Sequence, residues 1–538
     1  MTHVEFFHYL LLLIAGAAAL TWLAERLSLA PAIVLLLGGS AVALTGRPAP
    51  GMDPNLVLEA VLPPLLMSSA FYTAWKDFRR ELAPILSLAL GAVLFTTVAV
   101  AAVVHAVEPA LGWAPCFALG AIVSPPDAVA AKAMLRRFPL PPRLVTVLEG
   151  ESLVNDASGL LLYQMAVAAA VAGQLTPGHA AVVFSMLMLV GVAVGALAGY
   201  GMVWLIARLR EPLFCIVLTF LMAWASYSVA EDLHGSGVLS VVTCGLVLGI
   251  RQHEVFDAHV RIKAEATWEA VVFVLDALVF ILIGLALNGM VAKMERGGTL
   301  LAAGLGVALA ATVAAILARL AWVAAAVWLP SKLRSKLRSK PDERAGRSAR
   351  AWHFGEAVVL GWAGMRGVVS LAAALALPAD FPGRDVIVFS TFLVIFATLV
   401  IQGSTLAPLI RLLRLRSPQR TTMSELEARS HTFRASLHEL EKIARAADGG
   451  NDDERDIVER LLGEYRVRVH NNEKAHAEGA EHVERRAKHL RLELDLVSAS
   501  RQALLLLHQE NRIQDTVLHR IEAELDLEEL RLHRLLEP

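Results

Sequence analysis

The chain has 538 residues, of which 56% are hydrophobic and 18% are charged, and its mean hydropathy is +0.56. This composition excludes an ordinary soluble protein of the same length, which would be less apolar and more highly charged. The net charge of −1 gives no indication of a nucleic-acid partner. Cys116, Cys215 and Cys244 lie in apolar segments without the spacing of a disulfide framework or a zinc site.

Apolar blocks of bilayer-spanning length continue to about residue 416, which predicts an all-α, polytopic membrane domain over residues 1–416. Because no basic region precedes the first block, we interpret it as a membrane span and not as a signal peptide. Hydropathy predicts about 13 spans: residues 7–27, 30–46, 55–75, 83–105, 112–132, 144–172, 182–207, 212–231, 236–250, 268–292, 298–330, 355–378 and 386–410.

Loop charges predict the orientation of these spans, because positively charged loops lie on the cytoplasmic side. Basic residues concentrate in the loops after the odd-numbered spans, and few occur in the alternate loops. We therefore expect an external N-terminus and a cytoplasmic tail, in the inner or plasma membrane. The basic residues in the loops after the odd-numbered spans are Arg26, Lys76, Arg79, Arg80, Lys132, Arg136, Arg137, Arg143, Arg208, Arg210, Arg251, Arg261, Lys263, the run 332–350, Arg411, Arg414 and Arg416. Those in the alternate loops are Arg47, Lys293, Arg296 and Arg384.

Residues 417–538 are polar and helix-rich, which predicts a small helical tail in the cytosol with a regulatory role. Gly449, Gly450, Asn451 and Asp452 mark a break between its helices. Apolar residues recur at helical spacing from Leu490 to Leu535, among glutamates and arginines. This pattern is typical of an amphipathic bundle that packs on itself or on a second copy.

Charged side chains inside the bilayer are costly, so they usually line an ion path or pair with an opposite charge. The predicted spans contain both signs, which indicates a structural ion pair together with carboxylates that remain for a substrate cation. These residues are Asp127, Glu151, Asp156, Asp276, Arg319 and Arg366.

The fifth span contains two successive prolines, Pro125 and Pro126, directly before Asp127. Two prolines remove two backbone donors and force the preceding residues out of helical conformation. A helix broken in mid-membrane exposes carbonyls and helix ends, as in many transporter ion sites. We therefore predict a broken helix with Asp127 at the break; a proline kink with a paired aspartate is the alternative.

The sixth span begins with the run Glu-Gly-Glu-Ser-Leu-Val-Asn-Asp, which starts at residue 149. Ser152 and Asp156 are four residues apart and share one helix face, with Asn155 beside them. A hydroxyl, an amide and a carboxylate are hard oxygen ligands that suit sodium or lithium. Glu151 is directed elsewhere and can meet an arginine. A polar helix interface held by hydrogen bonds is the alternative.

In the twelfth span, Gly364 and Gly367 flank Arg366, and glycines allow close helix approach and local unwinding. Together the three segments resemble the monovalent cation/proton antiporters of the NhaP and sodium/proton exchanger type. Asp127 in its Pro-Asp-Ala-Val context matches a Thr-Asp-Pro-Val element, and residues 151–156 match Gly-Glu-Ser-Leu-x-Asn-Asp. Arg366 falls in a Gly-x-Arg-Gly element. Two further stretches of the family resemble residues 62–66 and 276–280.

The resemblance covers essentially the whole membrane domain and implies an NhaA-like fold of inverted repeats. In that fold two broken helices, here the fifth and twelfth spans, cross at mid-membrane. A mobile core domain carries the ion, and a fixed dimerisation domain joins two copies. The same resemblance implies that the cation/proton-binding residues are Asp127, Ser152, Asn155 and Asp156, and that Na⁺ binds Asp127, Ser152 and Asp156. Glu151 is expected to pair with Arg319 or Arg366, and we prefer Arg319.

Two departures from the family pattern affect the expected ligands. Pro126 stands where the family often has a threonine, and Ser68 stands where many members have a glutamate. One hydroxyl and one carboxylate are thus missing, which changes the expected coordination. Ser68 and Asp276 are candidate accessory residues.

A carboxylate in a low-dielectric cavity resists ionisation, so it can hold either a proton or a sodium ion, but not both. We therefore hypothesise an electroneutral sodium(lithium)/proton antiporter in which Asp156 exchanges the ions and Asp127 assists. Asn155 before Asp156 is typical of the electroneutral branch of the family. Potassium is the closest alternative ion, because it also uses oxygen ligands. The expected partners are Na⁺, H⁺, the lipid bilayer and a second copy of the chain, with Li⁺ or K⁺ as further candidates, and no cofactor.

Other function classes have less support. A channel or anion carrier would present basic residues to the cavity. A zinc enzyme would need a second histidine where Asp257 follows the His253-Glu254 pair, which we place in a loop. The Gly-Ser-Gly run at Ser236 resembles a serine-hydrolase turn only faintly, and a pure scaffold has no reason to bury carboxylates. We expect a secondary active transporter and not an enzyme.

Overall fold

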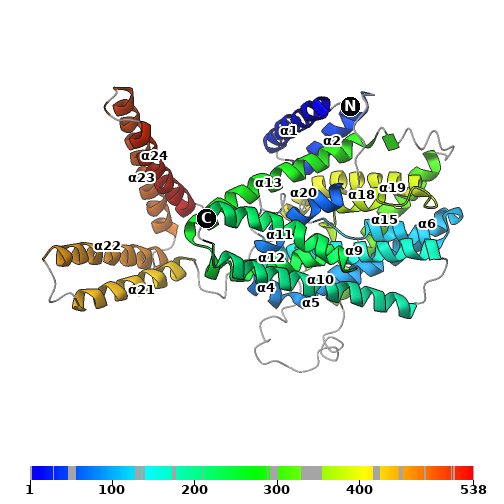
Figure 1. Cartoon of the computed structure of the whole chain (residues 1–538), viewed down its shortest axis with the longest axis horizontal. Coiled ribbons are helices and arrows are strands. Elements are labelled where there is room, and N and C mark those ends of the chain that lie inside the picture. The colour runs from blue at the N-terminus through cyan, green and yellow to red at the C-terminus, as the bar shows by residue number, and fades with distance from the viewer. Residues whose placement is uncertain are drawn as a thin grey trace. The chain divides into compact units, whose positions relative to one another are not determined.

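The structure is a computed structural model of the chain, and the part that it describes is entirely helical, without a strand (Figure 1). The chain divides into two compact units, Met1–Ser417 and Pro418–Pro538. The described residues are 3–27, 29–45, 56–127, 135, 138, 140–172, 177–209, 211–287, 289–290, 301–328, 354–415, 425–446, 452–477, 480–510, 512 and 515–536.

Each of the 13 predicted ranges overlaps helical structure in the first unit. Several helices contain a π-helical turn (η1, η2 and η5), and one short 3₁₀ turn, η3, precedes α7. The elements are α1 (His3–Arg26), α2 (Pro31–Ala43), η1 (Leu56–Val61), α3 (Leu62–Phe71), α4 (Trp75–Arg80), α5 (Leu82–Leu86), η2 (Ser87–Ala92), α6 (Val93–Val107), η3 (Pro109–Leu111), α7 (Trp113–Val123), α9 (Pro142–Ala172), α10 (Pro177–Ile206), α11 (Pro212–Asp232), α12 (Gly237–Val255), α13 (Ala258–Leu285), α15 (Leu301–Trp328), α17 (Phe354–Trp362), α18 (Val368–Leu375), α19 (Arg384–Ala397), η5 (Thr398–Gln402) and α20 (Gly403–Leu413).

Seven helices among the described residues are long and apolar enough to cross a membrane, and three shorter apolar helices accompany them. The shorter helices include α7, which ends at the proline pair of the fifth predicted span. α9 is long enough, but its Glu149, Glu151 and Asp156 reduce its apolar character. The seven are Leu82–Val107, Ala181–Ile206, Pro212–Asp232, Gly237–Val255, Val260–Leu285, Ala302–Ala326 and Arg384–Leu413.

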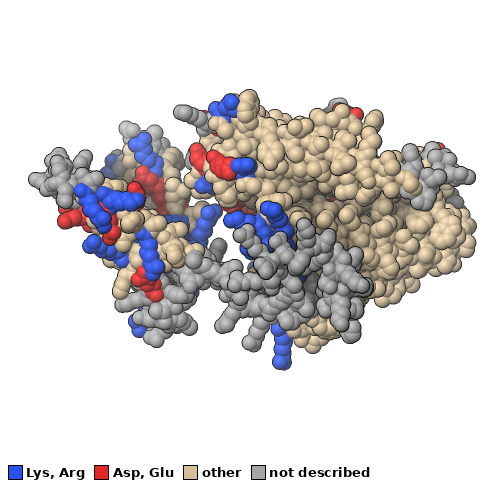
Figure 2. All heavy atoms as spheres, turned by 90° about the horizontal axis from the view of Figure 1, so that it is seen from below, with Lys and Arg blue, Asp and Glu red and all other residues tan. Residues whose placement is uncertain are grey.

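The outer surface of the first unit is apolar, as expected for a surface in contact with lipid. Leu189, Leu197 and Leu309 are each more than 65% exposed. In the space-filling view, most of the visible surface of this unit outside the grey residues carries no charge (Figure 2). Four charged residues of its helices are buried instead: Glu151, Asp156, Arg319 and Arg366 are all less than 10% exposed.

Four helices surround the centre of the first unit. α3 and α18 each contact both α9 and α13 there, and α7 packs against both α9 and α18. α13 also lies along α2 and α1, as Figure 1 shows. This arrangement brings segments that are more than 200 residues apart in the sequence to one place.

The second unit consists of two helix pairs. α21 (Glu425–Ala446) packs on α22 (Asp452–Ala477), and α23 (Ala480–Gln509) packs on α24 (Asp515–Leu536). A cluster around Leu490, Val497 and Leu532 joins the second pair. Arg501 of α23 bonds Asp526 and Glu529 of α24 over 2.7 and 2.5 Å, and these two carboxylates raise the pKa of its guanidinium.

One local prediction is wrong. His253 and Glu254 lie in the last turn of α12 and not in a loop, and Glu254 accepts two hydrogen bonds from Arg251. Ser236 and Asp257, which also belonged to the rejected enzyme motifs, act as helix N-caps. The Ser236 side chain accepts a hydrogen bond from the Leu239 amide, and the Asp257 side chain accepts one from the Val260 amide.

Several residues used in the predictions lie outside the described part of the chain. They are Arg47, Ala128, Val129, Lys132, Arg136, Arg137, Arg210, Lys293, Arg296, the run 332–350, Arg416, Gly449, Gly450 and Asn451.

Candidate functional site

Two helices of the first unit are interrupted, and the interruptions lie against each other. α7 ends just before Pro125 and Pro126, which cannot donate backbone hydrogen bonds. Residues 363–367 are likewise non-helical between α17 and α18. The Asp127 amide donates to the Met365 carbonyl over 2.7 Å, so the two interrupted segments are joined by their backbones.

Side chains of α9 and α6 satisfy polar groups at the first interruption. The Asn155 amide nitrogen donates to the Pro126 carbonyl over 2.6 Å. Thr97 donates to the Ser124 hydroxyl over 3.0 Å. Asn155 is fully buried and does not line the neighbouring cavity. The structure therefore places this predicted ligand behind the site, where it holds the broken segment.

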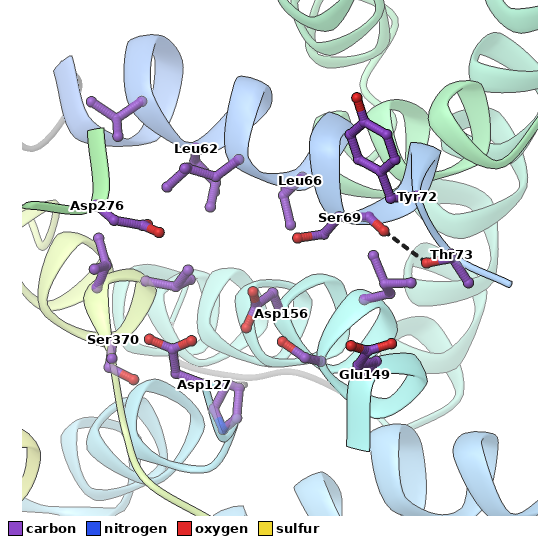
Figure 3. Close-up of a pocket in the computed structure, with 18 residues that line it drawn as sticks. Leu62, Leu66, Ser69, Tyr72, Thr73, Asp127, Glu149, Asp156, Asp276 and Ser370 are labelled. Atoms are coloured by element: carbon purple, nitrogen blue, oxygen red, sulfur yellow. Dashed lines mark hydrogen bonds between the residues drawn. The ribbon is translucent and has the colours of Figure 1, made fainter. Parts of the chain in front are cut away.

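A cavity of about 90 Å³ lies between α3, α9, α13 and α18, beside the interruptions (Figure 3). Asp127 of the first interruption and Ser152 and Asp156 of α9 line its wall. Asp276 reaches the same cavity from α13. The structure thus brings three of the four predicted cation/proton-binding residues and one predicted accessory residue to one space.

Several polar residues of this cavity are absent from the predicted site residues. Glu149 lies three residues before Ser152 and seven before Asp156, so helical periodicity alone would have placed it on the same face. Ser69 lines the cavity, whereas the predicted Ser68 does not. Because one residue along a helix turns the side chain by about 100°, the family register did not decide between these two serines. Thr73 and Ser370 also line the cavity.

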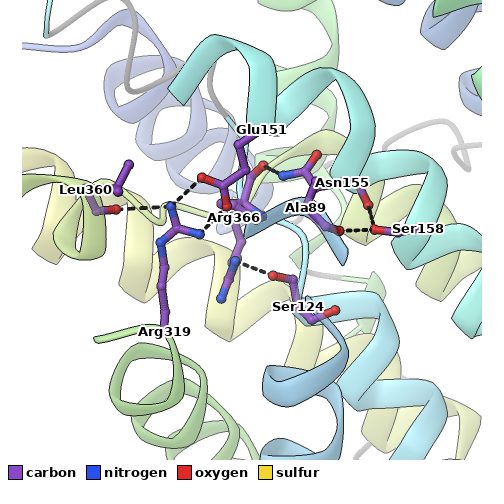
Figure 4. Close-up of polar contacts among 9 residues, drawn as sticks. Ala89, Ser124, Glu151, Asn155, Ser158, Arg319, Leu360 and Arg366 are labelled. Atoms are coloured by element: carbon purple, nitrogen blue, oxygen red, sulfur yellow. Dashed lines mark hydrogen bonds and ion pairs between the residues drawn. The ribbon is translucent and has the colours of Figure 1, made fainter. Parts of the chain in front are cut away.

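Glu151 points away from the cavity and pairs with Arg319 of α15 (Figure 4). The guanidinium makes two parallel bonds to the carboxylate, of 2.5 and 2.8 Å, and donates a third to the Leu360 carbonyl over 3.1 Å. Both side chains are at most 3% exposed. A side chain at Gly364 would overlap the Arg319 side chain, so the glycine lets the arginine pass.

Arg366 lies between the two interrupted segments and is 1% exposed. Its guanidinium donates to the Ser124 carbonyl over 2.6 Å, and its backbone amide donates to the Thr398 hydroxyl over 3.1 Å. The arginine therefore ties the second interruption to the end of α7 and to η5. It is a buried positive charge directly before Gly367, close to the start of α18.

Gly367 ends the second interruption and packs directly on Asp127. Any side chain at Gly367 would overlap the Asp127 carboxylate. Gly367 is also the residue before the first turn of α18, so the carboxylate lies at the N-terminal end of that helix. The helix dipole and the free amides of a first turn favour a negative charge at this place.

The cavity has the chemistry of a cation or proton site. Its polar lining consists of carboxylates, hydroxyls and backbone, and no lysine, arginine or histidine is among its lining residues. Hard oxygen donors of this kind suit alkali cations. Within the described residues, no group of three or more His, Cys, Asp or Glu side chains is arranged to hold a resident metal ion.

Comparison with known proteins agrees with this chemistry. The sequence model of the family described as "Sodium/hydrogen exchanger, transmembrane" matches residues 10–412. The chain belongs to the sodium/hydrogen exchanger family. The resemblance inferred from the motifs is thus confirmed, and the chain is a multi-pass membrane protein of a cation/proton exchanger family.

The relatives of the exchanger cover most of its length. An uncharacterized Na⁺/H⁺ exchanger of Mycobacterium tuberculosis is 33% identical over 536 residues, which are 97% of this chain and 95% of that protein. A sodium, potassium, lithium and rubidium/H⁺ antiporter of Bacillus pumilus is 30% identical over 444 residues, with 78% and 62% of the two chains covered. The solved sodium proton antiporter MjNhaP1 of Methanocaldococcus jannaschii has a TM-score of 0.60 and 19% identity, with 75% of this chain and 100% of that chain covered. This likeness shows a shared fold.

Proposed function

We propose that the exchanger is an electroneutral antiporter that exchanges one cytoplasmic Na⁺ or Li⁺ for one external H⁺ by alternating access. The observation that carries the proposal is that Asp127, Ser152 and Asp156 line one cavity beside two interrupted helices. Such interruptions expose backbone and helix ends to an ion within the membrane. Na⁺ and H⁺ are substrates in this scheme, and no cofactor takes part.

Repulsion between two aspartates provides the exchange. Asp127 and Asp156 line the same cavity of about 90 Å³. Two nearby carboxylates in a low dielectric are stabilised together only when a cation or a proton joins them. Either ion relieves the repulsion, and they exclude each other at Asp156. Ser152 adds a neutral oxygen ligand from the same helix face.

We also propose how the transporter is divided into domains and oriented in the membrane. Residues 1–416 form the transport domain, with about 13 spans, inverted repeats and two crossing broken helices in an NhaA-like arrangement. A mobile core carries the ion, and a dimerisation subdomain joins two copies. Residues 417–538 form a cytosolic regulatory tail. The N-terminus is external and the protein lies in the plasma membrane, as the loop charges favour.

A potassium/proton antiporter of the same fold is the second candidate. The Bacillus pumilus relative is described as an antiporter of potassium and rubidium as well as of sodium and lithium. Oxygen ligands alone do not select among these ions, because all of them accept carboxylate and hydroxyl oxygens.

Proton flux in everted membrane vesicles tests both candidates. Na⁺, Li⁺ and K⁺ are added in turn, and we expect Na⁺ and Li⁺ to drive proton movement that does not respond to an imposed membrane potential. Asp156→Asn and Asp127→Asn should abolish the flux at wild-type expression levels. Glu254→Gln, which alters only an exposed pair at the end of α12, is the matched control and should retain it. Full sodium-driven flux in Asp156→Asn vesicles would refute the assignment.

A further inference from the structure

η5 and the start of α20 lie along the second interruption. The Thr398 hydroxyl of η5 accepts a hydrogen bond from the Arg366 amide over 3.1 Å. A Cβ atom at Gly403, the first residue of α20, would lie 3.3 Å from the Met365 sulfur. Gln402 precedes Gly403 and follows Thr398 by four residues, so it shares a helix face with Thr398. The Gln402 side chain therefore lies on the side of η5 that faces the interruption.

The side-chain amide of Gln402 is buried without a partner. The residue is 1% exposed, and neither the nitrogen nor the oxygen of its amide has a hydrogen-bond partner in the described part of the chain. Burying an amide without partners is costly, because the group loses its hydrogen bonds to water and gains none. A protein that alternates between two arrangements can offer the missing partner in the second one.

The second interruption offers the groups that such an amide needs. Residues 364–367 are non-helical, so their amides and carbonyls do not form the regular hydrogen bonds of a helix. Some of these groups find partners elsewhere: the Arg366 amide donates to Thr398, and the Met365 carbonyl accepts from the Asp127 amide. Non-helical backbone presents donors and acceptors side by side, and the amide of Gln402 supplies both kinds of group in return.

The backbone around Gln402 has a form that allows the side chain to move. η5 is a π-helical turn between α19 and α20, so the helix continues on both sides of it. Single π-helical turns are rare and occur frequently at functional sites. A change between π-helical and α-helical bonding turns the residues of this segment about the helix axis. Such a change moves Gln402 relative to the interruption and leaves the span intact.

We propose that Gln402 is a positioning residue for exchange, and that its amide bonds the backbone of the second interruption in the arrangement that alternates with this resting one. That bond holds the interruption, and with it Asp127, while the site faces the other side of the membrane. Asp127 follows the interruption because its amide bonds Met365 and its carboxylate packs on Gly367. Gln402 does not line the cavity and touches no ion in this scheme. The inference rests on the proposed alternating access.

Substitution of Gln402 by methionine separates the two arrangements, because methionine has a similar length but no amide. In the resting arrangement Gln402→Met removes an unsatisfied group, so the purified protein should unfold at or above the wild-type midpoint. In the other arrangement it removes a hydrogen bond, so the maximal sodium-driven flux in everted vesicles should fall about five- to tenfold. The KM for Na⁺ should stay within about twofold, because the cavity lining is unchanged.

Thr391→Val is the matched control on the same span. The Thr391 hydroxyl is also fully buried, and it has no hydrogen-bond partner among the residues that the structure describes. Thr391 lies in α19, two helical turns or about 10 Å before Thr398 and its bond to the interruption. Thr391→Val should therefore match Gln402→Met in unfolding at or above the wild-type midpoint, but it should keep the wild-type flux.

Three results would overturn the inference. A Gln402→Met protein that folds poorly or unfolds below the wild-type midpoint would show that the amide is already bonded in the resting arrangement. A stable variant with flux within about twofold of the control would show that Gln402 takes no part in exchange. A KM for Na⁺ raised more than about twofold would place its effect at the ion. Asp156→Asn in the same vesicles separates the two proposals: retained flux there defeats the proposed function, whereas an inactive Asp156→Asn beside a fully active Gln402→Met defeats only this inference.

Discussion

Replacing Arg319 by methionine should destabilise the membrane unit severely, because Glu151 would keep a buried charge without its partner. The pair is bidentate, and both side chains are at most 3% exposed. Removing one member of such a pair costs about 3–5 kcal/mol. The Leu360 carbonyl also loses its donor, which adds about 1 kcal/mol.

The double variant Glu151→Gln/Arg319→Met separates the buried charge from lost packing. With both charges removed, about 2–3 kcal/mol of the loss should be recovered, because the uncompensated anion is the larger part of the cost. In both the single and the double variant, methionine at position 319 keeps a side chain of similar length to arginine in the space beside Gly364. The double variant should therefore unfold at a higher temperature than either single variant.

Thermal unfolding of the purified protein in detergent measures these differences, with loss of monodisperse protein as the readout. The control is Arg251→Met, because Arg251 and Glu254 form an exposed pair on α12 of the same unit. Exposed pairs contribute little, so this variant should unfold at the wild-type midpoint. An Arg319→Met protein as stable as the control, or a double variant no better than the singles, would contradict the reasoning.

Three further predictions concern transport. Gly367→Ala should reduce exchange at least about tenfold, because the alanine methyl group displaces the Asp127 carboxylate from the end of α18. Proton flux in vesicles measures this reduction. Ser152→Ala should raise the KM for Na⁺ about tenfold with little change in maximal flux, since one neutral ligand contributes about 1–1.5 kcal/mol; an unchanged KM would place Ser152 outside the coordination sphere. Lowering the pH should raise the apparent KM for Na⁺ by up to about tenfold per unit at constant maximal flux, because protons compete for Asp156, and noncompetitive inhibition in a sodium titration would speak against a shared site.

Local sequence patterns predicted the elements of this exchanger well. Apolar blocks of bilayer length predicted a helix in every expected range, because backbone groups in lipid must form their hydrogen bonds within the helix. The pair Pro125–Pro126 predicted an interruption that the structure shows directly after α7. Ser152 and Asp156 share a helix face because the 3.6-residue period alone decides it. These are short-range properties, and a single sequence contains them in full.

Local periodicity does not decide which of two adjacent side chains faces the cavity, because that direction depends on neighbouring helices. Ser68 and Ser69 are adjacent, yet only Ser69 lines the cavity. The Asn155 amide nitrogen donates to the Pro126 carbonyl, a contact that the sequence pattern does not indicate. The rotation of α3 and α9 about their own axes is set by packing against other helices, which the local pattern does not record.

Only the tertiary structure decided which distant groups meet. Glu151 could have paired with Arg319 or Arg366, and the choice of Arg319, 168 residues away, depends on where tertiary packing places α15 relative to α9. The backbone bond from Asp127 to Met365 and the approach of Asp276 from α13 depend on packing in the same way. A sequence specifies which residues are charged and which face of a helix carries them. Which faces come together is decided by side-chain packing over the whole unit, because contacts between distant helices are set by shape and burial and not by local periodicity.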